Sequence, residues 1–285
     1  MMTLESATYS GQGDPGAYRR LRAPPPLTAG ASDLMAGLKA WRLWTMLGWN
    51  DIRQRYRRST LGPFWITLSM AIFIVLLGAI YSRIFKMDIA IFLPYIAMGI
   101  ITWGFISGTT IESCSAFVDG GGIIKQIRLP YSLYVLRVVW RNIIIIFHTI
   151  VLIVPIGIIF HLKVSWVDLL VLPGLFVVFA NQIWVGVVVA VLSTRYRDIV
   201  QLISTAIQIA MFATPIMWPV SSVGDARFIA DINPLYHLIE IVRSPLLGDA
   251  PALMSWFVAI GVCVAGYLIA ILLLGRGSLR VVYWL

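Results

Sequence analysis

Residues 250–275 read APALMSWFVAIGVCVAGYLIAILLLG, a run of 26 residues without a single charged side chain. A helix of roughly 20 residues, rising about 1.5 Å per residue, crosses the hydrocarbon core of a bilayer. The run lacks the strict alternation of polar and apolar residues that is typical of a barrel strand. Because backbone polar groups in lipid must be hydrogen-bonded within their own segment, we expect a transmembrane helix here.

Five more runs without Asp, Glu, Lys or Arg precede it, and each is long enough to cross a bilayer. They cover residues 59–82, 89–111, 142–162, 169–194 and 199–224. The whole chain of 285 residues is 59% hydrophobic and 12% charged, whereas soluble proteins carry roughly 25% charged residues. We therefore expect an all-α polytopic membrane protein in which residues 59–285 form a domain of six transmembrane helices. A cytosolic enzyme and a nucleic-acid-binding module are excluded.

The basic residues predict the orientation of the chain. Six spans place both termini on one side of the membrane, and 17 of the 22 Lys and Arg residues then lie on that side. An excess of Lys and Arg is typical of cytoplasmic segments, so both termini should be cytoplasmic. The net charge of +9 is attributed to topology and anionic lipid, and no nucleic-acid partner is expected. Residues 1–33 are polar and rich in Gly and Pro, which predicts a disordered cytoplasmic tail.

Residues 34–58 connect this tail to the first span. Apolar residues recur there at helical spacing beside basic ones: Leu34, Leu38, Trp41, Trp44 and Leu47. The pattern favours an amphipathic helix in the headgroup layer, although a soluble helix packed on cytoplasmic loops shows the same pattern. Four arginines follow within six residues: Arg53, Arg55, Arg57 and Arg58. By themselves they are better explained by the positive-inside rule than by phosphate binding, which guanidinium groups also support.

Two loops carry further signals. Between the second and third spans, the glycines at 120–122 are expected to end one helix, and residues 123–129 to form a short amphipathic helix stopped by Pro130. That connector is either well placed to receive force from a partner or an ordinary loop. After the fifth span, Pro215 and Pro219 predict a kink, and the apolar stripe on residues 234–247 predicts a re-entrant or surface helix at the external mouth.

Several kinds of chemistry are missing from the sequence. It contains no Gly-Lys dipeptide, so no phosphate-binding loop for ATP hydrolysis is expected. The three histidines and two cysteines lack the spacing of metal ligands, and the spans lack the buried acids of ion-coupled transporters. We therefore expect no catalytic residue, metal site or cofactor on this chain. The energy for transport must come from elsewhere, or the transport is passive.

Five motifs occur in order along the chain. They are RYRRSTLGPFW (residues 55–65), IKQIRLP (124–130), YRD (196–198), TPIMWP (214–219) and NPLYHLIEIVR (233–243). Together they resemble the membrane subunits of type-2 ABC exporters of polysaccharides, namely O-antigen, capsule and teichoic-acid permeases. The resemblance covers residues 34–285, and the tail at 1–33 lies outside it.

The resemblance implies a half-transporter of the bacterial inner membrane. Two copies would form a homodimeric channel for a lipid-linked polysaccharide, next to membrane lipid, and two separate ATPase subunits would bind ATP and Mg. It also implies roles for three groups of residues, and it reverses the preference at the arginine cluster. The candidates for binding the lipid pyrophosphate are Arg53, Arg55, Tyr56, Arg57 and Arg58. The candidates for ATPase coupling are Gly120, Gly121, Gly122, Ile123, Ile124, Lys125, Gln126, Ile127 and Arg128. The candidates for the external gate are Pro215, Trp218, Pro219, Tyr236, Glu240 and Arg243.

A passage for sugars can be lined by aromatic rings, which contact the apolar faces of a saccharide. Tyr95, Trp103, Phe105 and Trp184 are the candidate channel aromatics. Three alternatives to a polysaccharide exporter stay open. The same fold could export a smaller lipid-linked or drug-like molecule. A membrane-embedded glycosyl- or acyltransferase would need a paired set of catalytic side chains, which does not appear, and a passive channel or scaffold would need no ATPase partner.

Overall fold

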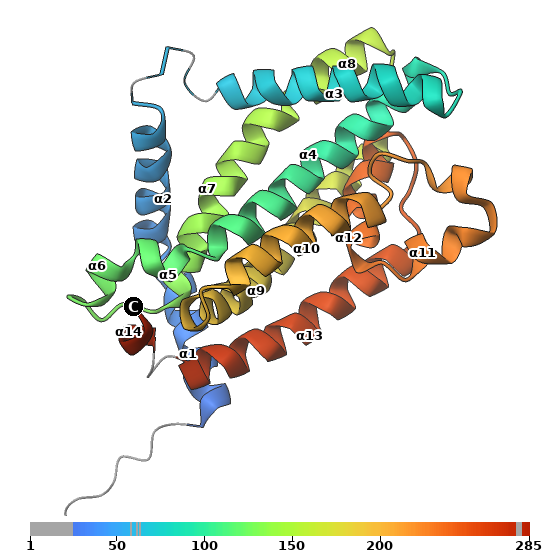
Figure 1. The fold of residues 1–285 in the computed structure, drawn as a ribbon. Coiled ribbons are helices and arrows are strands. Elements are labelled where there is room, and N and C mark those ends of the chain that lie inside the picture. Colours follow the sequence, from blue (N-terminus) through green and yellow to red (C-terminus); the bar gives the residue numbers. More distant parts are fainter. Residues whose placement is uncertain (1–24, 58, 61, 63, 278–280) are drawn as a thin grey trace, which may run out of the picture.

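The structure is a computed structural model that describes residues 25–57, 59–60, 62, 64–277 and 281–285, without the side chains of residues 221, 223, 225 and 226. All regular elements in these ranges are helices, as the sequence predicts (Figure 1). Five helical segments are long and apolar enough to cross a membrane. They are α3 (Phe64–Ile84), α4 (Ile89–Ser113), α7 (Ser132–Ile150) with α8 (Ile153–Ile159), the 3₁₀ helix η1 (Trp166–Leu170) with α9 (Val171–Arg195), and α13 (Leu253–Gly277).

The remaining elements are shorter and lie before, between or after these segments. They are α1 (Pro26–Lys39), α2 (Trp41–Arg55), α5 (Ala116–Asp119), α6 (Gly121–Ile124), α10 (Ile199–Ala213), η2 (Val220–Arg227), α11 (Phe228–Asp231), α12 (Pro234–Leu246) and α14 (Val281–Trp284). Figure 1 shows α1, α6 and α14 at one end of the bundle and α11 at the other. We call these the proximal end and the distal end.

The fifth of the six predicted spans differs from its prediction. A single span was expected over residues 199–224, but α10 ends at Ala213 and has 15 residues, a length of about 22 Å. Thr214 is extended, with φ −94° and ψ 139°, because a following proline disfavours the helical conformation. The helix still runs antiparallel to α4: Val200 lies beside Cys114 in one pocket, and Ile216 packs on Gly99. The chain therefore returns to the distal end on a helix shorter than the other five segments.

The third span also begins earlier than predicted. The run without charges starts at residue 142, whereas the helical segment starts at Ser132 and ends at Ile159. The backbone N–H groups of Tyr131 and Ser132 each donate to the Asp33 carboxylate at 2.9 Å, which satisfies donors that a helix N-terminus leaves free. Arg137 is carried inside α7 because its guanidinium pairs with a carboxylate. A search for runs without charged residues therefore misses the start of α7, because the helix begins before its paired arginines.

The boundary between tail and domain is corrected as well. Residues 1–24 of the expected tail lie outside the described residues, but Pro26–Asp33 are helical and belong to α1. This helix packs on the end of α13 so closely that a Cβ on Gly30 would lie 2.0 Å from the carbonyl oxygen of Ile271. The amphipathic segment expected from residue 34 is two helices that join at Ala40. The second, α2, packs on α7, and Trp44 meets Trp140 edge to face at 5.7 Å.

The connector after α4 differs in register from its prediction. The glycines were expected to end a helix before an amphipathic helix at 123–129, yet α6 begins at Gly121 and ends at Ile124. Gly120 is buried, and a Cβ there would lie 2.5 Å from the ring of Tyr134. That close approach sets the position of the connector against α7. After Ile124 the backbone makes one more turn, in which the N–H of Ile127 donates to the carbonyl of Ile123 at 2.9 Å.

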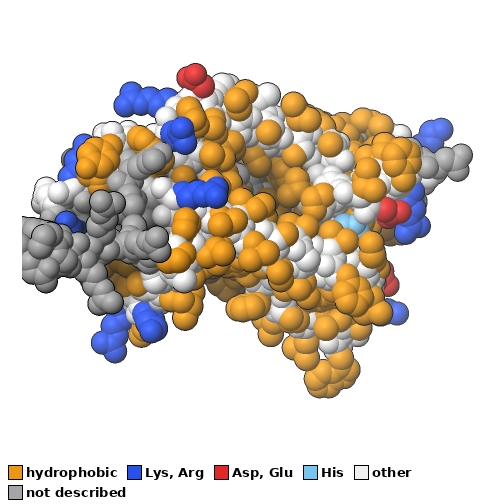
Figure 2. Space-filling view, turned by 90° about the horizontal axis from the view of Figure 1, so that it is seen from below, with side chains coloured by type: hydrophobic (Ala, Val, Ile, Leu, Met, Phe, Trp, Pro, Cys, Tyr) orange, Lys and Arg blue, Asp and Glu red, His pale blue; other side chains and the backbone are white. Residues whose placement is uncertain are grey.

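The outer surface of the long helices is apolar. Phe64 of α3, Leu172 of α9 and Leu253 of α13 are between 67% and 75% exposed. Figure 2 shows apolar side chains over the middle of one face and most Lys and Arg side chains toward its ends. This distribution matches a belt of lipid flanked by two aqueous layers. Two buried clusters hold the helices together, one around Phe92, Ile96 and Phe105 and the other around Phe117 and Tyr134.

Candidate functional site

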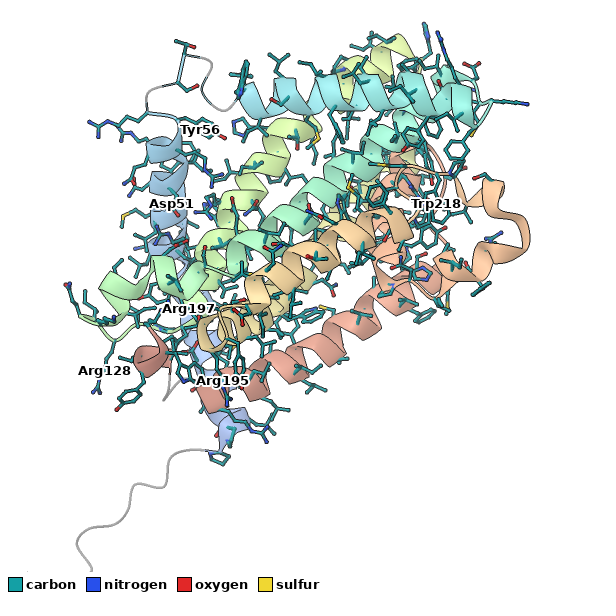
Figure 3. All side chains as sticks on the ribbon, in the orientation of Figure 1. Asp51, Tyr56, Arg128, Arg195, Arg197 and Trp218 are labelled. Carbon is teal, nitrogen blue, oxygen red and sulfur yellow. The ribbon has the colours of Figure 1, made fainter. Side chains whose placement is uncertain are left out.

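The arginine-rich segment lies where α2 ends. Arg53 and Arg57 are exposed, whereas Arg55 donates a hydrogen bond to Oε1 of Glu112 on α4 at 2.9 Å. Arg58 lies outside the described residues. Burial raises the pKa of Tyr56, against the opposing effect of the Arg55 charge, so the phenol keeps its proton at neutral pH and can donate it in a hydrogen bond. We call Arg53, Arg55, Tyr56 and Arg57 the arginine site; Figure 3 labels Tyr56 near the end of α2.

A charge network, which the sequence did not indicate, connects this site to the bundle. Arg137 donates to both oxygens of the Asp51 carboxylate. Arg141 donates to Asp51 at 3.2 Å and to Oε2 of Glu112 at 2.8 Å. Asn142 donates to the same Oε2 at 2.7 Å. With Arg55 included, three guanidinium groups share two carboxylates, so the network has one surplus positive charge and joins α2, α4 and α7.

Four of the predicted gate residues, Pro215, Trp218, Glu240 and Arg243, meet in a second cluster near the distal end. Arg243 of α12 is almost completely buried; it donates to Glu240 at 2.6 Å and to the carbonyl of Pro215 at 2.7 Å. The ring of Tyr95 lies 4.1 Å below its guanidinium carbon. Tyr95 also donates to the carbonyls of Pro215 and Trp218 at 3.2 and 3.3 Å. The cluster ties the turn after α10 to α4 and α12.

The other two gate candidates lie outside this cluster. Pro219 is buried and its carbonyl accepts a hydrogen bond from Ser222 at 2.6 Å. The ring of Tyr236 meets that of His237 edge to face at 5.2 Å. Tyr236 also lines a distal pocket of about 610 Å³ with Glu240 and Asp249. Trp218, which Figure 3 labels at the distal end, donates its indole N–H to the carbonyl of Phe212.

The candidate channel aromatics are not exposed on a passage within the described chain. Trp103 and Phe105 are buried in the core, where Phe105 meets Phe179 at 4.9 Å between ring centroids. Trp184 packs directly on Gly266 of α13. Tyr95 belongs to the Arg243 cluster. In a single copy each of these rings packs between helices, and their role as channel-lining rings stays a prediction.

A polar stripe on α10 is the surface feature that sequence reasoning missed. None of the residues of α10 is classed as buried, and its polar members lie on one face. They are Gln201, Ser204, Thr205 and Gln208. The two hydroxyls donate to carbonyls of their own helix, but the side-chain amides of the two glutamines have no hydrogen-bond partner among the described residues. The sequence does contain this pattern: the four polar residues are three, four and seven positions apart, and residues at these spacings share one face of a helix.

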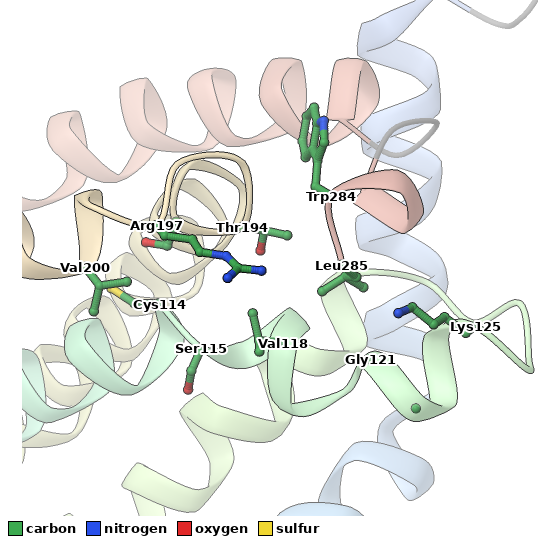
Figure 4. Close-up of a pocket in the computed structure, with 12 residues that line it drawn as sticks. Cys114, Ser115, Val118, Gly121, Lys125, Thr194, Arg197, Val200, Trp284 and Leu285 are labelled. Atoms are coloured by element: carbon green, nitrogen blue, oxygen red, sulfur yellow. The ribbon is translucent and has the colours of Figure 1, made fainter.

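The coupling candidates lie around a pocket of about 610 Å³ at the proximal end (Figure 4). Its lining includes Gly121, Gly122 and Lys125 of the connector, together with Arg197 and Trp284. Figure 4 shows the guanidinium of Arg197 pointing into this space from the loop between α9 and α10. Neither Lys125 nor Arg197 has an ion-pair partner in the part of the chain that the structure describes.

The remaining coupling candidates are placed along the same connector. Gln126, Ile127 and Arg128 are exposed, Ile123 is half-buried and Ile124 is buried in the core. The connector thus presents an apolar side chain, Ile127, beside cationic ones at the end of the molecule. Figure 3 labels Arg128, Arg195 and Arg197 at this same end.

Comparisons with known proteins agree with this architecture. A family model described as ABC-2 type transporter matches residues 42–247, which is more than half of the chain. The O-antigen export system permease protein RfbA of Myxococcus xanthus is 22% identical over 212 residues, covering 72% of this chain and 82% of the relative. The protein of the same name from Klebsiella pneumoniae is 23% identical over 195 residues, covering 66% and 74%. The chain therefore belongs to the ABC-2 type transporter family and is a multi-pass membrane subunit of an ABC transporter.

Proposed function

We propose that this chain is the permease subunit of an ATP-driven exporter that moves a lipid-linked, O-antigen-like polysaccharide out of the cytoplasm. Two copies form the conduit in the bacterial inner membrane, with both termini of each copy in the cytoplasm. Two separate ATPase subunits bind ATP and Mg and supply the energy. The names of the two relatives support the substrate class, and the surfaces described above support the path.

The observation that carries this proposal is the uncovered polar stripe of α10. Gln201 and Gln208 present amides to the outside of a single copy, in a helix that has no charged residue. A polar group without a hydrogen-bond partner is costly in lipid, so this face meets water, a second copy or the substrate. Uncharged amides and hydroxyls can form hydrogen bonds with the hydroxyl groups of a saccharide. These bonds are weak enough that the polymer can still move along the helix.

The arginine site supports the proximal end as the place where the substrate is received. Exposed guanidinium groups form bidentate hydrogen bonds to phosphate oxygens, and a neutral Tyr56 can donate one more. The neighbouring network has a surplus positive charge. These features favour the anionic pyrophosphate end of a lipid-linked glycan over an uncharged molecule.

The connector and its pocket support an ATPase partner at the same end. Ile127 is 57% exposed between Lys125 and Arg128, an arrangement of one apolar contact with flanking charges that suits a protein interface. Lys125 and Arg197 at the pocket offer positive charge to acidic side chains of the partner. The connector follows α4 directly in the chain. A movement of the ATPase partner against the connector would therefore displace α4, the helix that contributes to both charged clusters.

The experiment that tests this function replaces the polar stripe. We expect Gln201→Leu with Gln208→Leu to lower ATP-dependent delivery of lipid-linked polysaccharide by about tenfold or more, since loss of substrate contacts worth about 1.4 kcal/mol has that effect. Transport is measured in proteoliposomes that contain the full chain with its co-purified ATPase. Leu202→Ala with Ile209→Ala, on the neighbouring apolar face of α10, is the matched control and should leave delivery within about twofold.

Two results would contradict the proposal. Unchanged delivery in the glutamine variant would remove the stripe from the path. Delivery by the chain without an ATPase, or without inhibition by vanadate, would exclude the ATP-driven mechanism.

A further inference from the structure

The first turn of α7 is completed by a side chain of α1. The first backbone N–H groups of a helix have no acceptor within the helix itself. Here the N–H groups of Tyr131 and Ser132 donate to the two oxygens of the Asp33 carboxylate, each at 2.9 Å. The next two N–H groups, of Leu133 and Tyr134, already donate to carbonyls three residues earlier, each at 3.1 Å. Asp33 therefore supplies the two acceptors that this turn lacks.

Water cannot take the place of Asp33 at this turn. Ser132 is completely buried, and its hydroxyl donates back to the backbone carbonyl of Asp33 at 2.8 Å. The carboxylate also places a negative charge at the positive end of the α7 dipole. A buried N–H group that loses its acceptor is destabilising. Without Asp33, the first turn of α7 would therefore open more often.

The helix that carries Asp33 lies in close contact with both α7 and α13 (Figure 1). A Cβ on Gly37 of α1 would overlap the hydroxyl of Ser132 in α7. A Cβ on Gly275 of α13 would overlap the backbone carbonyl oxygen of Pro26 in α1, and Gly30 approaches the backbone of α13 equally closely. Because these contacts leave no space between the helices, α1 joins the proximal ends of α7 and α13.

The turn that Asp33 completes is also where the connector meets α7. Phe117 of α5, just before the connector, meets the ring of Tyr131 edge to face at 5.8 Å. Gly120, at the start of the connector, lies against the ring of Tyr134. The connector then runs directly into α7. A displacement of the connector therefore reaches the same turn whose N–H groups donate to Asp33.

We propose that Asp33 is a positioning residue for energy coupling. It keeps the first turn of α7 closed, so that a movement of the ATPase against the connector displaces α7 and α13 together. Without Asp33, opening of this turn absorbs part of the movement. This inference rests on the proposed function, in which the ATPase binds at the connector. Because Asp33 acts through α7, it changes the amount of substrate delivered per ATP and not the rate of ATP hydrolysis.

The test measures lipid-linked polysaccharide delivered per ATP hydrolysed, in proteoliposomes that contain the full chain with its co-purified ATPase. We expect Asp33→Ala to lower this ratio by about fivefold or more, because the loss of a helix cap shifts an equilibrium by about that factor. ATP hydrolysis should stay within about twofold of the wild type. Asp33→Asn keeps one acceptor oxygen and should lower the ratio less, and it replaces Asp33→Ala if that variant does not fold.

Asp88→Ala is the matched control. Asp88 caps the distal end of α4, where it accepts a hydrogen bond from the N–H of Ala90 at 2.9 Å, so this variant loses a cap that does not touch the connector. Its delivery per ATP should stay within about twofold of the wild type. Hydrogen–deuterium exchange gives a second readout, which needs no transport. Asp33→Ala should exchange the amides of Tyr131 and Ser132 about fivefold faster, and Asp88→Ala should not.

The possible failures are distinct. If wild-type delivery depends on ATP and neither Asp33 variant changes the delivery per ATP, the inference is overturned and the proposed function stands. Unchanged amide exchange in Asp33→Ala would also overturn it, because Asp33 would then not keep the turn closed. An equal fall of the ratio in Asp33→Ala and Asp88→Ala would show a general loss of stability in place of a specific role. Delivery by the wild type without an ATPase would refute the proposed function, and this inference with it.

Discussion

Two charged clusters are attached to α4, one near each end, and they are built in opposite ways. At the distal end, the Arg243 side chain is 2% exposed and has a single carboxylate, Glu240, as its ionic partner. At the proximal end, three arginines share Asp51 and Glu112, and one of them, Arg55, is 43% exposed. The distal cluster has one guanidinium for one carboxylate, whereas the proximal cluster has three guanidinium groups for two carboxylates, and one of the three is open to solvent.

This difference separates a fixed contact from an exchangeable one. A buried charge is tolerated only when its hydrogen bonds are satisfied, and Arg243 satisfies them with Glu240, the Pro215 carbonyl and the ring of Tyr95. Removing the guanidinium takes the Arg243 donor from the Pro215 carbonyl and leaves Glu240 with the Ser244 hydroxyl but no positive charge. In the proximal network each carboxylate has two guanidinium partners, so it keeps one when the other leaves. We infer that the distal cluster holds the turn after α10 in place, and that the proximal cluster responds to ligands.

The largest effect on stability is expected from Arg243→Ala. The substitution leaves Glu240 without its guanidinium and the Pro215 carbonyl without its 2.7 Å donor, and breaking a buried pair in this way costs about 3–5 kcal/mol. The free energy of unfolding is measured by SDS titration in mixed micelles. Arg227→Ala is the control, because Arg227 and Asp231 form an exposed pair at 3.8 Å on the same end, worth about 0–1 kcal/mol. Equal losses in the two variants would show that Arg243 is not a fixed contact.

An intermediate effect is expected from Arg141→Ala. Asp51 keeps Arg137, and Glu112 keeps Arg55 and Asn142. Both carboxylates therefore stay paired, and the free energy of unfolding should fall by about 1–3 kcal/mol. The same SDS titration applies.

The double variant Arg141→Ala with Arg55→Ala sharpens this result. It should lose more than the sum of the single losses, because Glu112 then has no guanidinium partner and the two sites are coupled through it. Simple additivity would contradict the shared network.

The sequence predicted the helical fold and most of its long segments, and the exceptions have physical causes. The absence of charge identified segments close to α3, α4, α9 and α13. It misplaced the start of α7, because Arg137 and Arg141 are paired within the bundle and a paired charge does not end a membrane helix. It overextended α10, because the helix ends at Ala213 whereas the next charged residue in the sequence is Asp225.

The site was predictable by residue type but not by partner. Glu240 and Arg243 are three residues apart on α12, a spacing at which side chains of one helix meet, and they form an ion pair. Tyr95 was predicted as a channel-lining ring because aromatic rings contact saccharides, and nothing in the sequence indicated that it lies under Arg243, which is 148 residues further along the chain. The pairing of Arg55 with Glu112 spans 57 residues. Such contacts depend on how different helices pack against each other. The periodicity of residues along one helix does not predict that packing.

The smallest effect on stability is expected from Arg55→Ala, and this is the sharpest test of the comparison between the two ends. Because Arg55 is half-exposed and Glu112 keeps its other donors, the loss should stay below about 1 kcal/mol, as for other solvent-screened ion pairs. The binding of farnesyl pyrophosphate, measured by calorimetry on the full chain in nanodiscs, should nevertheless weaken by about tenfold, since a charge-assisted contact to phosphate is worth about 1.5–3 kcal/mol. Arg55→Lys should retain part of this affinity, because an ammonium keeps the charge but not the planar fork. A large loss of stability with unchanged binding would make Arg55 a structural residue like Arg243, and the two ends would no longer differ in kind.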